Sequence, residues 1–174
     1  MTTYAVVGKP VTREDGPDKV SGKLIYPADI ILPGMLWGRV LRSPFPHARI
    51  VNIDASRALR LRGVRAVVTG KDVAGMLVGR LLRDVPLLPD RKVRFVGEKV
   101  AAVAVNKPDT TEEALNLIDV EYEELPAIFD PLEAMQPGAP LVHDGSPWYE
   151  GPSGPYQPQG NIAFHETWSN GDLE

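Results

Sequence analysis

The stretch from Val93 to Pro131 constrains the fold of this chain most, because strand, helix and strand signals follow one another there without interruption. Lys99 to Val105 is a short run of Val and Ala, with the length and composition of a strand buried on both faces. A helix is predicted next, from about Thr110 to Leu117. Ile118 to Glu123 then alternates apolar with acidic residues, which predicts a strand with one face in water.

The start of the predicted helix carries a signature of its own. Asp109 is expected to act as the N-cap, and Glu112 follows three residues later to complete a capping box. About a dozen residues separate the two strands, enough for a crossover helix and too many for a hairpin. We therefore expect the strands to pair in parallel through a right-handed connection, as one βαβ unit.

The remaining elements are expected to be short, because the chain contains 17 Pro and 16 Gly among its 174 residues. Further strand signals fall at Lys19–Tyr26, Met35–Arg42, Ala48–Ile53 and Val64–Val68. The loop from Pro27 to Gly34 is expected to carry Ile30, Ile31 and Leu32 toward a core, and Met76 to Leu88 is expected to be irregular. The predicted fold class is α+β with a central mixed sheet.

Changes in residue composition along the sequence divide the chain into three parts. Residues 1–17 are expected to form an extended arm, residues 18–131 the folded domain, and residues 132–174 a Pro- and Gly-rich linker that ends in a strand at Asn161–Trp168. The window from Gly145 to Gly160 is expected to form no ladder of its own. A strand after a long linker, with nothing following to pair it, indicates that the chain was cut from something larger.

The tail also carries aromatic residues that are costly to leave in water. We interpret them as anchors into a partner surface, or as a cause of self-association of the isolated chain. They are Trp148, Tyr149, Tyr156 and Trp168.

Charge and composition exclude several classes of function. A net charge of −4, with acids and bases mixed along the chain, offers no basic surface to nucleic acid. The absence of Cys removes disulfides, thiolate metal sites, iron–sulfur clusters and a cysteine nucleophile. No apolar run approaches the roughly 18 residues of a membrane span, and the N-terminus has no leader pattern. A soluble, cytoplasmic protein without a membrane partner is expected.

Acidic and histidine residues are the first candidates for chemistry. The acids Asp119, Glu121, Glu123 and Glu124 are explained by the wet face of a strand, where a perturbed pKa for acid–base work is not expected. The histidines His47, His143 and His165 lie far apart and lack the spacing of metal ligands. Neither group predicts a catalytic or metal site.

Glycine turns and serines are the remaining candidates. Gly70-Lys71-Asp72 lacks the other residues of a phosphate loop, and Gly97-Glu98 lacks those of a dinucleotide fingerprint. Ser21, Ser43 and Ser56 are not set in a nucleophile elbow. We therefore predict no catalytic, cofactor-binding or metal-binding residue in this chain.

Three stretches carry a family resemblance in their order and spacing. They are Asp18-Lys19-Val20-Ser21-Gly22 with Tyr26 and Asp29, then GRVLRSPFPHARIVNID at residues 38–54, then RFVGEKVAAV at residues 94–103 with VEYEELP at residues 120–126. Together they resemble the N-terminal region of the molybdenum-binding large subunit of the xanthine dehydrogenase, aldehyde oxidase and carbon monoxide dehydrogenase family. The chain departs from the family at Phe45, where His is frequent.

The resemblance implies an α/β hammerhead domain within a larger oxidoreductase. Enzymes of that family hydroxylate aldehydes, purines and related heteroaromatics with oxygen from water at a molybdopterin centre, and pass electrons through iron–sulfur clusters to FAD. The family's pterin-binding and catalytic residues lie downstream of this region, toward which Asn170-Gly171-Asp172-Leu173 resembles the lead-in. Expected partners are the remaining domains of the large subunit and the iron–sulfur and FAD subunits.

A second hypothesis comes from a different class of function. The same fold could serve as a free-standing binding or scaffold module without a molybdenum partner. Mass analysis of the native product separates the two hypotheses, because a longer parent chain supports the enzyme and a natural stop at Glu174 supports the module.

Overall fold

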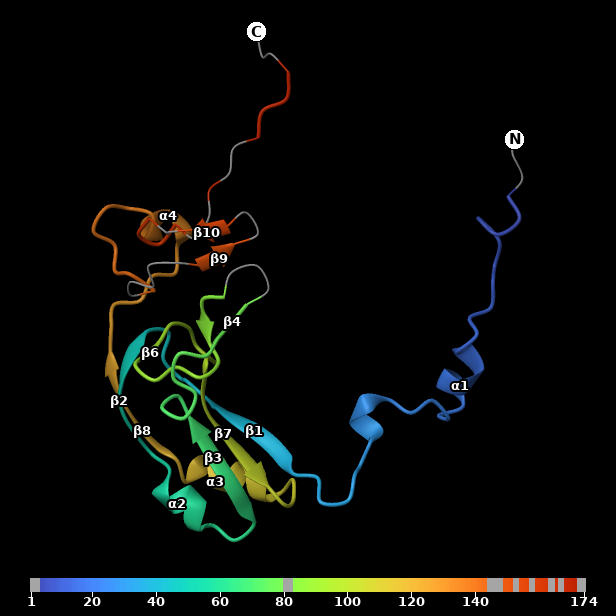
Figure 1. The fold of residues 1–174 in the computed structure, drawn as a ribbon, viewed down its shortest axis with the longest axis horizontal. Coiled ribbons are helices and arrows are strands. Elements are labelled where there is room, and N and C mark those ends of the chain that lie inside the picture. The colour runs from blue at the N-terminus through green and yellow to red at the C-terminus, as the bar shows by residue number, and fades with distance from the viewer. Residues whose placement is uncertain are drawn as a thin grey trace. The chain divides into compact units, whose positions relative to one another are not determined.

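The structure is a computed structural model, which describes residues 4–79, 83–143, 149–151, 154–156, 159–162, 165 and 168–171. The chain divides into two compact units, Met1–Met35 and Leu36–Glu174. The second unit holds the sheets described below (Figure 1). No helix in the described part of the chain is both long and apolar enough to cross a membrane.

The first unit contains two short helical segments, α1 (Gly16–Val20) and the 3₁₀ turn η1 (Pro27–Asp29). Asp15 pairs with Lys19 at 2.6 Å, and a proline in the first turn suits the start of α1. The strand predicted at Lys19–Tyr26 is wrong, because Lys19 and Val20 belong to α1 and a turn follows in which Gly22 has a φ of +71°. The prediction that the loop carries Ile31 into a core is also wrong, since this side chain is 74% exposed.

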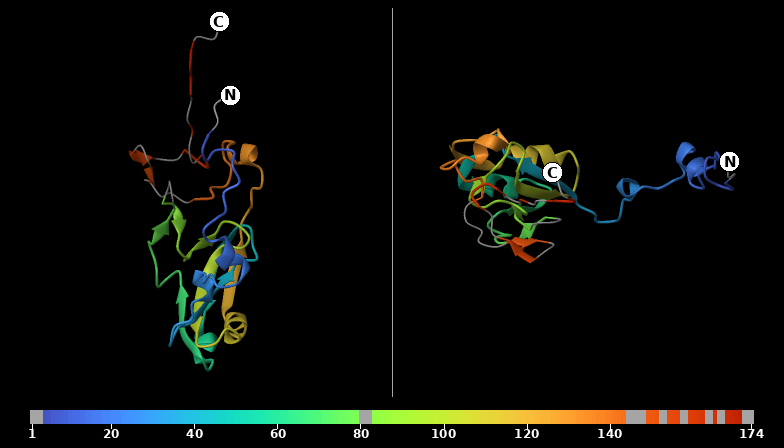
Figure 2. Two further views of the ribbon diagram at one scale, coloured as in Figure 1. Left: turned by 90° about the vertical axis from the view of Figure 1, so that its right-hand side faces the viewer. Right: turned by 90° about the horizontal axis from the view of Figure 1, so that it is seen from above.

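The first sheet of the second unit has three strands in the order β1-β7-β3. They are β1 (Trp37–Arg42), β7 (Lys99–Val105) and β3 (Val64–Thr69). Helices α2 (Ser56–Arg60) and α3 (Thr110–Asn116) contact each other beside this sheet, as Figures 1 and 2 show. The predicted strands at the positions of β1, β7 and β3 are confirmed.

The second sheet also has three strands, in the order β6-β2-β8. They are β6 (Lys92–Val93), β2 (Ala48–Asp54) and β8 (Asp119–Glu124). The predicted strands at the positions of β2 and β8 are confirmed, and β6 is new. The burial of β8 alternates from residue to residue, with its acids exposed, as its sequence pattern predicts.

Two short strand pairs and one helix complete the unit. Strand β4 (Leu77–Val78) pairs with β5 (Val85–Pro86), so the region predicted as irregular contains a small antiparallel ladder. Strand β9 (Tyr149–Gly151) pairs with β10 (Gly154–Tyr156), so the expectation of no ladder between residues 145 and 160 is wrong. Helix α4 is Pro131–Ala134. Residues 163, 164, 166 and 167 of the strand predicted at residues 161–168 lie outside the described residues.

The α+β class is confirmed, but the parallel pairing of the predicted βαβ unit is wrong. Strand β7 lies between β1 and β3, whereas β8 pairs with β2 in the other sheet. Every strand pairing in the described residues is antiparallel. The connection through α3 therefore crosses from one sheet to the other, which a connection of that length permits as readily as a return to the same sheet.

The core consists of two apolar clusters. The larger lies between the first sheet and the helices and contains Ala58, Ala101, Val103, Val105, Ala114, Leu115 and Ile118. The smaller contains Ala48, Ile50, Val93 and Val100. Ile53 and Val120 pack against both clusters, so one side chain from β2 and one from β8 join the two sheets into a single unit.

The capping box predicted at α3 is also wrong. Asp109 has helical backbone angles, with φ −62° and ψ −28°, and its side chain makes no capping hydrogen bond among the described residues. A capping side chain usually needs an extended backbone to reach back to the first amides, and Asp109 lacks it. The carboxylate of Glu112 instead pairs with Arg39 at 2.9 Å. The first turn is held by Thr111, whose Oγ1 donates to the carbonyl of Pro108 at 2.6 Å.

Thr111 should therefore matter more to stability than Asp109. Thr111→Val keeps the shape of this buried side chain and removes its hydrogen bond, which should cost about 1 kcal/mol of unfolding free energy. The exposed Asp109→Ala is the matched control and should stay within about ±0.5 kcal/mol. Denaturant midpoints measure both, and a larger loss in Asp109→Ala would restore the capping box.

Candidate functional site

The acidic residues considered from the sequence lie along β8 and do not form a site. Glu123 pairs with Arg49 at 2.9 Å and Asp119 with Arg57 at 3.4 Å, and all four of these side chains are more than half exposed. Glu121 and Glu124 are exposed on the same strand. These carboxylates therefore form a solvated surface, on which paired ions contribute little to stability.

The three histidines differ in their burial. His47 is buried, His143 is half-buried and His165 is exposed. Across the residues that the structure describes, no three His, Asp or Glu side chains gather closely enough to hold a metal ion. The histidines thus have separate environments, and only that of His47 is a deep one.

The two glycine turns have structural explanations. Gly70 lies so close to another segment that an added Cβ would collide with the carbonyl oxygen of Pro89, so no other residue fits there. Asp72 closes this turn by accepting hydrogen bonds from the backbone and the hydroxyl of Thr69. Those hydrogen bonds hold the pKa of Asp72 below its usual value. Gly97 has a φ of +89°, in the left-handed region that favours glycine.

Gly97 lies in a turn that is closed by a buried ion pair between Arg94 and Glu98. Sequence reasoning missed this pair. Glu98 is 3% exposed. It accepts hydrogen bonds from the backbone nitrogen of Arg94 at 2.5 Å and from Arg94 Nη1 at 3.3 Å. Arg94 Nη1 also donates to the carbonyl of Lys92 at 3.1 Å. The only signal in the sequence is a pair of opposite charges four residues apart, which is common on helices and says nothing of burial.

The turn that begins at Ser43 is joined by backbone hydrogen bonds to the turn between Arg94 and Glu98. Ser43 donates its amide to the Glu98 carbonyl at 2.9 Å, and its own carbonyl accepts from the Gly97 amide at 2.8 Å. Its hydroxyl accepts from the amide of Phe45 at 3.0 Å, and the Phe45 ring lies 5.1 Å from that of Tyr122. Burial raises the pKa of Tyr122, and a hydrogen bond from Ser43 opposes the shift. Ser43 therefore holds two turns together, and no base lies within its hydrogen bonds among the described residues.

The turn that the Arg94–Glu98 pair closes exposes two apolar side chains to solvent. Phe95 and Val96 lie between its two charged residues and are 52% and 61% exposed. Arg42 Nη1 donates to the Gly97 carbonyl at 2.8 Å and fixes the turn from the outside. Two large apolar side chains on a firmly held turn are typical of a contact surface.

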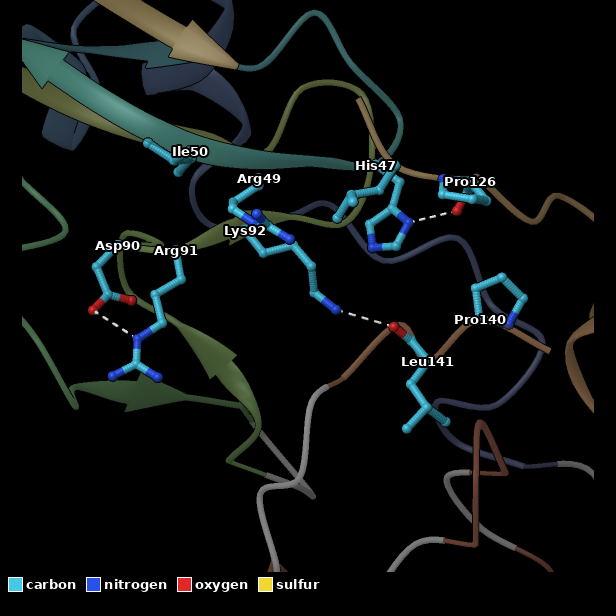
Figure 3. Close-up of a pocket in the computed structure, with 10 residues that line it drawn as sticks. His47, Arg49, Ile50, Asp90, Arg91, Lys92, Pro126, Pro140 and Leu141 are labelled. Atoms are coloured by element: carbon cyan, nitrogen blue, oxygen red, sulfur yellow. Dashed lines mark hydrogen bonds and ion pairs between the residues drawn. The ribbon is translucent and has the colours of Figure 1, made fainter. Parts of the chain in front are cut away.

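A hollow with a volume of about 520 Å³ lies beside His47 (Figure 3). It is bounded by β2, by the segment that leads into β6, and by the chain on either side of α4. The residues that line it are His47, Arg49, Ile50, Asp90, Arg91, Lys92, Leu125, Pro126, Pro140 and Leu141. Sequence reasoning did not single out this set, because its members come from separate stretches of the chain.

The polar groups at the hollow are held by backbone carbonyls. His47 Nδ1 lies 2.6 Å from the carbonyl oxygen of Pro126, which can only accept, so Nδ1 carries the proton. His47 Nε2 is buried and has no hydrogen-bond partner among the described residues. Lys92, only 6% exposed, donates from Nζ to the carbonyl of Leu141 at 3.0 Å. Figure 3 shows Lys92 Nζ reaching across the hollow toward Leu141.

The segment after α4 is tied down by one side chain from the tail. Asn161 accepts from the Val142 amide at 2.9 Å, and it donates to the carbonyls of Ala134 at 3.0 Å and Pro140 at 2.9 Å. Of the predicted aromatic anchors, Trp168 is 85% exposed and Trp148 lies outside the described residues. Tyr149 and Tyr156 lie opposite each other in the β9–β10 pair.

Comparison with protein-family models matches residues 21–126 to the description "Aldehyde oxidase and xanthine dehydrogenase, a/b hammerhead domain". Among curated proteins, the chain is 42% identical over 171 residues to a probable xanthine dehydrogenase polypeptide of Bacillus subtilis, covering 97% of this chain and 21% of that protein. It is 41% identical over 141 residues to the nicotinate dehydrogenase large molybdopterin subunit of Eubacterium barkeri, covering 80% of this chain and 33% of that protein. The chain thus spans a third or less of these two relatives.

Solved structures give the same result. Quinoline 2-oxidoreductase from Pseudomonas putida 86 superposes with a TM-score of 0.71 at 40% identity, over 79% of this chain and 18% of that one. Aldehyde oxidoreductase from Desulfovibrio gigas superposes with a TM-score of 0.69 at 32% identity, over 78% of this chain and 16% of that one.

The buried ion pair should be a major contributor to stability. Glu98→Gln leaves the guanidinium of Arg94, 19% exposed, without its counter-charge, and this should cost about 3 kcal/mol of unfolding free energy. The same substitution at the exposed Glu121 is the control and should stay within about ±0.5 kcal/mol. Chemical denaturation compares the two variants, and equal midpoints would mean that the pair is not important to the fold.

Proposed function

The chain belongs to the aldehyde oxidase and xanthine dehydrogenase family through its a/b hammerhead domain, and from this we propose that it is the structural, interface-forming part of a molybdenum hydroxylase large subunit. Relatives named for xanthine, nicotinate and carbon monoxide dehydrogenases are oxidoreductases, which supports a parent activity in that class. The proposed reaction is hydroxylation of an aldehyde, purine or related heteroaromatic compound with oxygen from water. The proposed location is the cytoplasm.

The proposed division of the chain follows its sequence. Residues 1–17 form an arm, residues 18–131 the hammerhead domain, and residues 132–174 lead toward molybdopterin-binding domains. The partners are those domains, together with iron–sulfur and FAD subunits. We propose no catalytic step for this chain, which agrees with the lack of any group of three His, Asp or Glu side chains close enough to hold a metal ion among the described residues.

The observation that carries the interface role is a set of large apolar side chains left in water on two neighbouring segments. The β4–β5 ladder and its flanks expose Met76, Leu77, Val78, Val85 and Leu87. The turn closed by the buried ion pair exposes Phe95 and Val96. Leu77 and Arg94 line one hollow of about 270 Å³, so the two segments are close in space. Large exposed apolar patches are rare on soluble monomeric proteins and usually mark a surface that contacts another protein.

The interface role can be tested by assembly in trans. We expect the chain to co-purify with the remaining domains of the large subunit and with the iron–sulfur and FAD subunits of its own organism when all are co-expressed. The double variant Phe95→Ser, Val96→Ser should weaken this association at least about tenfold, because exposed aromatic anchors dominate interface energies. The measurement is the concentration dependence of co-elution in size-exclusion chromatography.

A matched control is available on the same unit. Val51 and Leu59 are 52% and 55% exposed and lie on β2 and α2, so the double variant Val51→Ser, Leu59→Ser removes a similar apolar area elsewhere. It should leave co-elution unchanged. Equal loss in both double variants would show that the turn has no special part in assembly.

Metal content gives a separate prediction. The isolated chain, purified without a tag, should contain far less than one equivalent of molybdenum or zinc, since it has no Cys and its described residues form no ligand cluster. The assembled complex should contain molybdenum. Elemental analysis measures both, and near-equimolar metal in the isolated chain would contradict the assignment of this segment to a structural role.

A further inference from the structure

The two faces of the sheet β1-β7-β3 have different surroundings. Leu41, Ala101 and Val103 point to one face, where they pack in the larger cluster. That cluster includes Ala58 of α2 and Ala114 of α3, so both helices lie on this face. Side chains alternate along a strand, so the intervening residues point to the opposite face. The strand register places them in two rows, which together we call the open face: Gly38–Ala104–Ala66 and Val40–Ala102–Val68.

The open face has the composition of a covered surface. None of its residues is charged or polar, and none is buried. An antiparallel sheet usually carries polar side chains on a face that meets water. Val100–Val105 is instead apolar on both sides, as in a strand with a packed layer above and below, yet Ala102 and Ala104 are only half-buried. The open face is therefore suited to a further layer of protein.

Gly38 indicates independently that another backbone comes close to the open face. Its φ is not in the left-handed region, and the bulge of this strand pair lies at Leu41–Arg42, so the local conformation does not require glycine. Among the described residues, an added Cβ would meet only the carbonyl oxygen of Val103, at an ordinary 3.8 Å. A glycine inside a strand often marks the close approach of a second backbone.

We propose that one α-helix from the remaining chain of the large subunit packs on the open face through an uncharged, apolar side. This inference rests on the proposed function, because the helix belongs to that subunit. The chain spans 21% and 33% of the two relatives described above, so most of each relative lies outside the matched part. Three strands about 4.8 Å apart form a face roughly 10 Å wide, which matches the diameter of one helix with its side chains.

The small side chains favour a helix over a second copy of this chain. Two copies packed through their open faces would place glycine and alanine opposite glycine and alanine. Such side chains would not fill the spacing of roughly 10 Å between packed sheets. The larger apolar side chains of a helix can fill the space above Gly38 and Ala104, between Val40 and Val68.

The first test adds a side chain where the open face has room for one. In the isolated chain, Gly38→Val should give a denaturant midpoint equal to or above that of the wild type, because valine is favoured over glycine in strands. Association with the remaining domains of the large subunit, supplied in trans, should weaken at least about tenfold, because the new side chain overpacks the contact. The measurement is the concentration dependence of co-elution.

A matched control lies in the other sheet. Asn52 is exposed on β2, so Asn52→Val adds the same side chain to a strand position outside the open face. It should leave the association unchanged.

The second test uses the absence of Cys from the chain. Ala104→Cys places a single small thiol on the open face, opposite Gly38 and Ala66. Iodoacetamide should label it in the isolated chain and at least about tenfold more slowly in the assembled complex, because packed protein excludes the reagent. Asn52→Cys should be labelled at the same rate in both states. Mass spectrometry of this chain measures the labelling.

The outcomes separate this inference from the proposed function. If the wild-type chain assembles but Gly38→Val assembles equally well, or Ala104→Cys is labelled equally in both states, the inference is overturned and the proposed function stands. A lowered midpoint of the isolated Gly38→Val, or no labelling of the isolated Ala104→Cys, would show that this chain already fills the open face. A wild-type dimer that Gly38→Val dissociates would identify a second copy as the occupant. A wild-type chain that does not assemble at all would overturn both.

Discussion

The two-sided burial of β7 is the constraint on which the second unit depends. Its residues Ala101, Val103 and Val105 pack into the larger cluster, while Val100 packs into the smaller one. Small and β-branched side chains suit such a strand, because each face must accept close neighbours without voids. With β1 and β3 paired on its two edges, β7 leaves no edge for β8, which completes the second sheet instead.

The limits of single strands and helices were predictable from the sequence, because interactions between residues close in the chain decide them. The limits of β7 agree with the apolar run of Lys99–Val105, and α3 ends one residue before the predicted helix. Strand partners were not predictable in this way, because β1 and β7 are joined by contacts between residues that lie far apart in the chain. The same holds for the capping box, where the backbone of Asp109 is helical and Arg39, distant in sequence, pairs with the carboxylate of Glu112. Pattern matching detects compatible residue types, whereas backbone angles and competing partners decide which hydrogen bonds form.

The candidate sites also differ in whether local sequence pattern or long-range contacts decide them. Alternation along β8 correctly predicted its acids to be exposed, since period and burial are directly linked in a strand. The Arg94–Glu98 pair and the hollow beside His47 were missed, because their properties depend on burial and on segments that meet only in the folded chain. In particular, the lining combines residues 47, 49 and 50 with residues 90–92, 125–126 and 140–141, none of which is unusual in its own stretch.

One segment links the hollow to the exposed turn. Between Leu88 and Glu98 the buried residues are Leu88, Pro89, Lys92, Val93 and Glu98, so this length of chain is anchored at its start, middle and end. Arg91 projects from it at the hollow, and Phe95 and Val96 project at the turn. Because Lys92 contributes its ammonium to the hollow and its carbonyl to Arg94, a displacement of β6 would be felt at both places. The hollow and the apolar turn therefore share one anchored segment, because Lys92 of β6 makes a hydrogen bond at each of them.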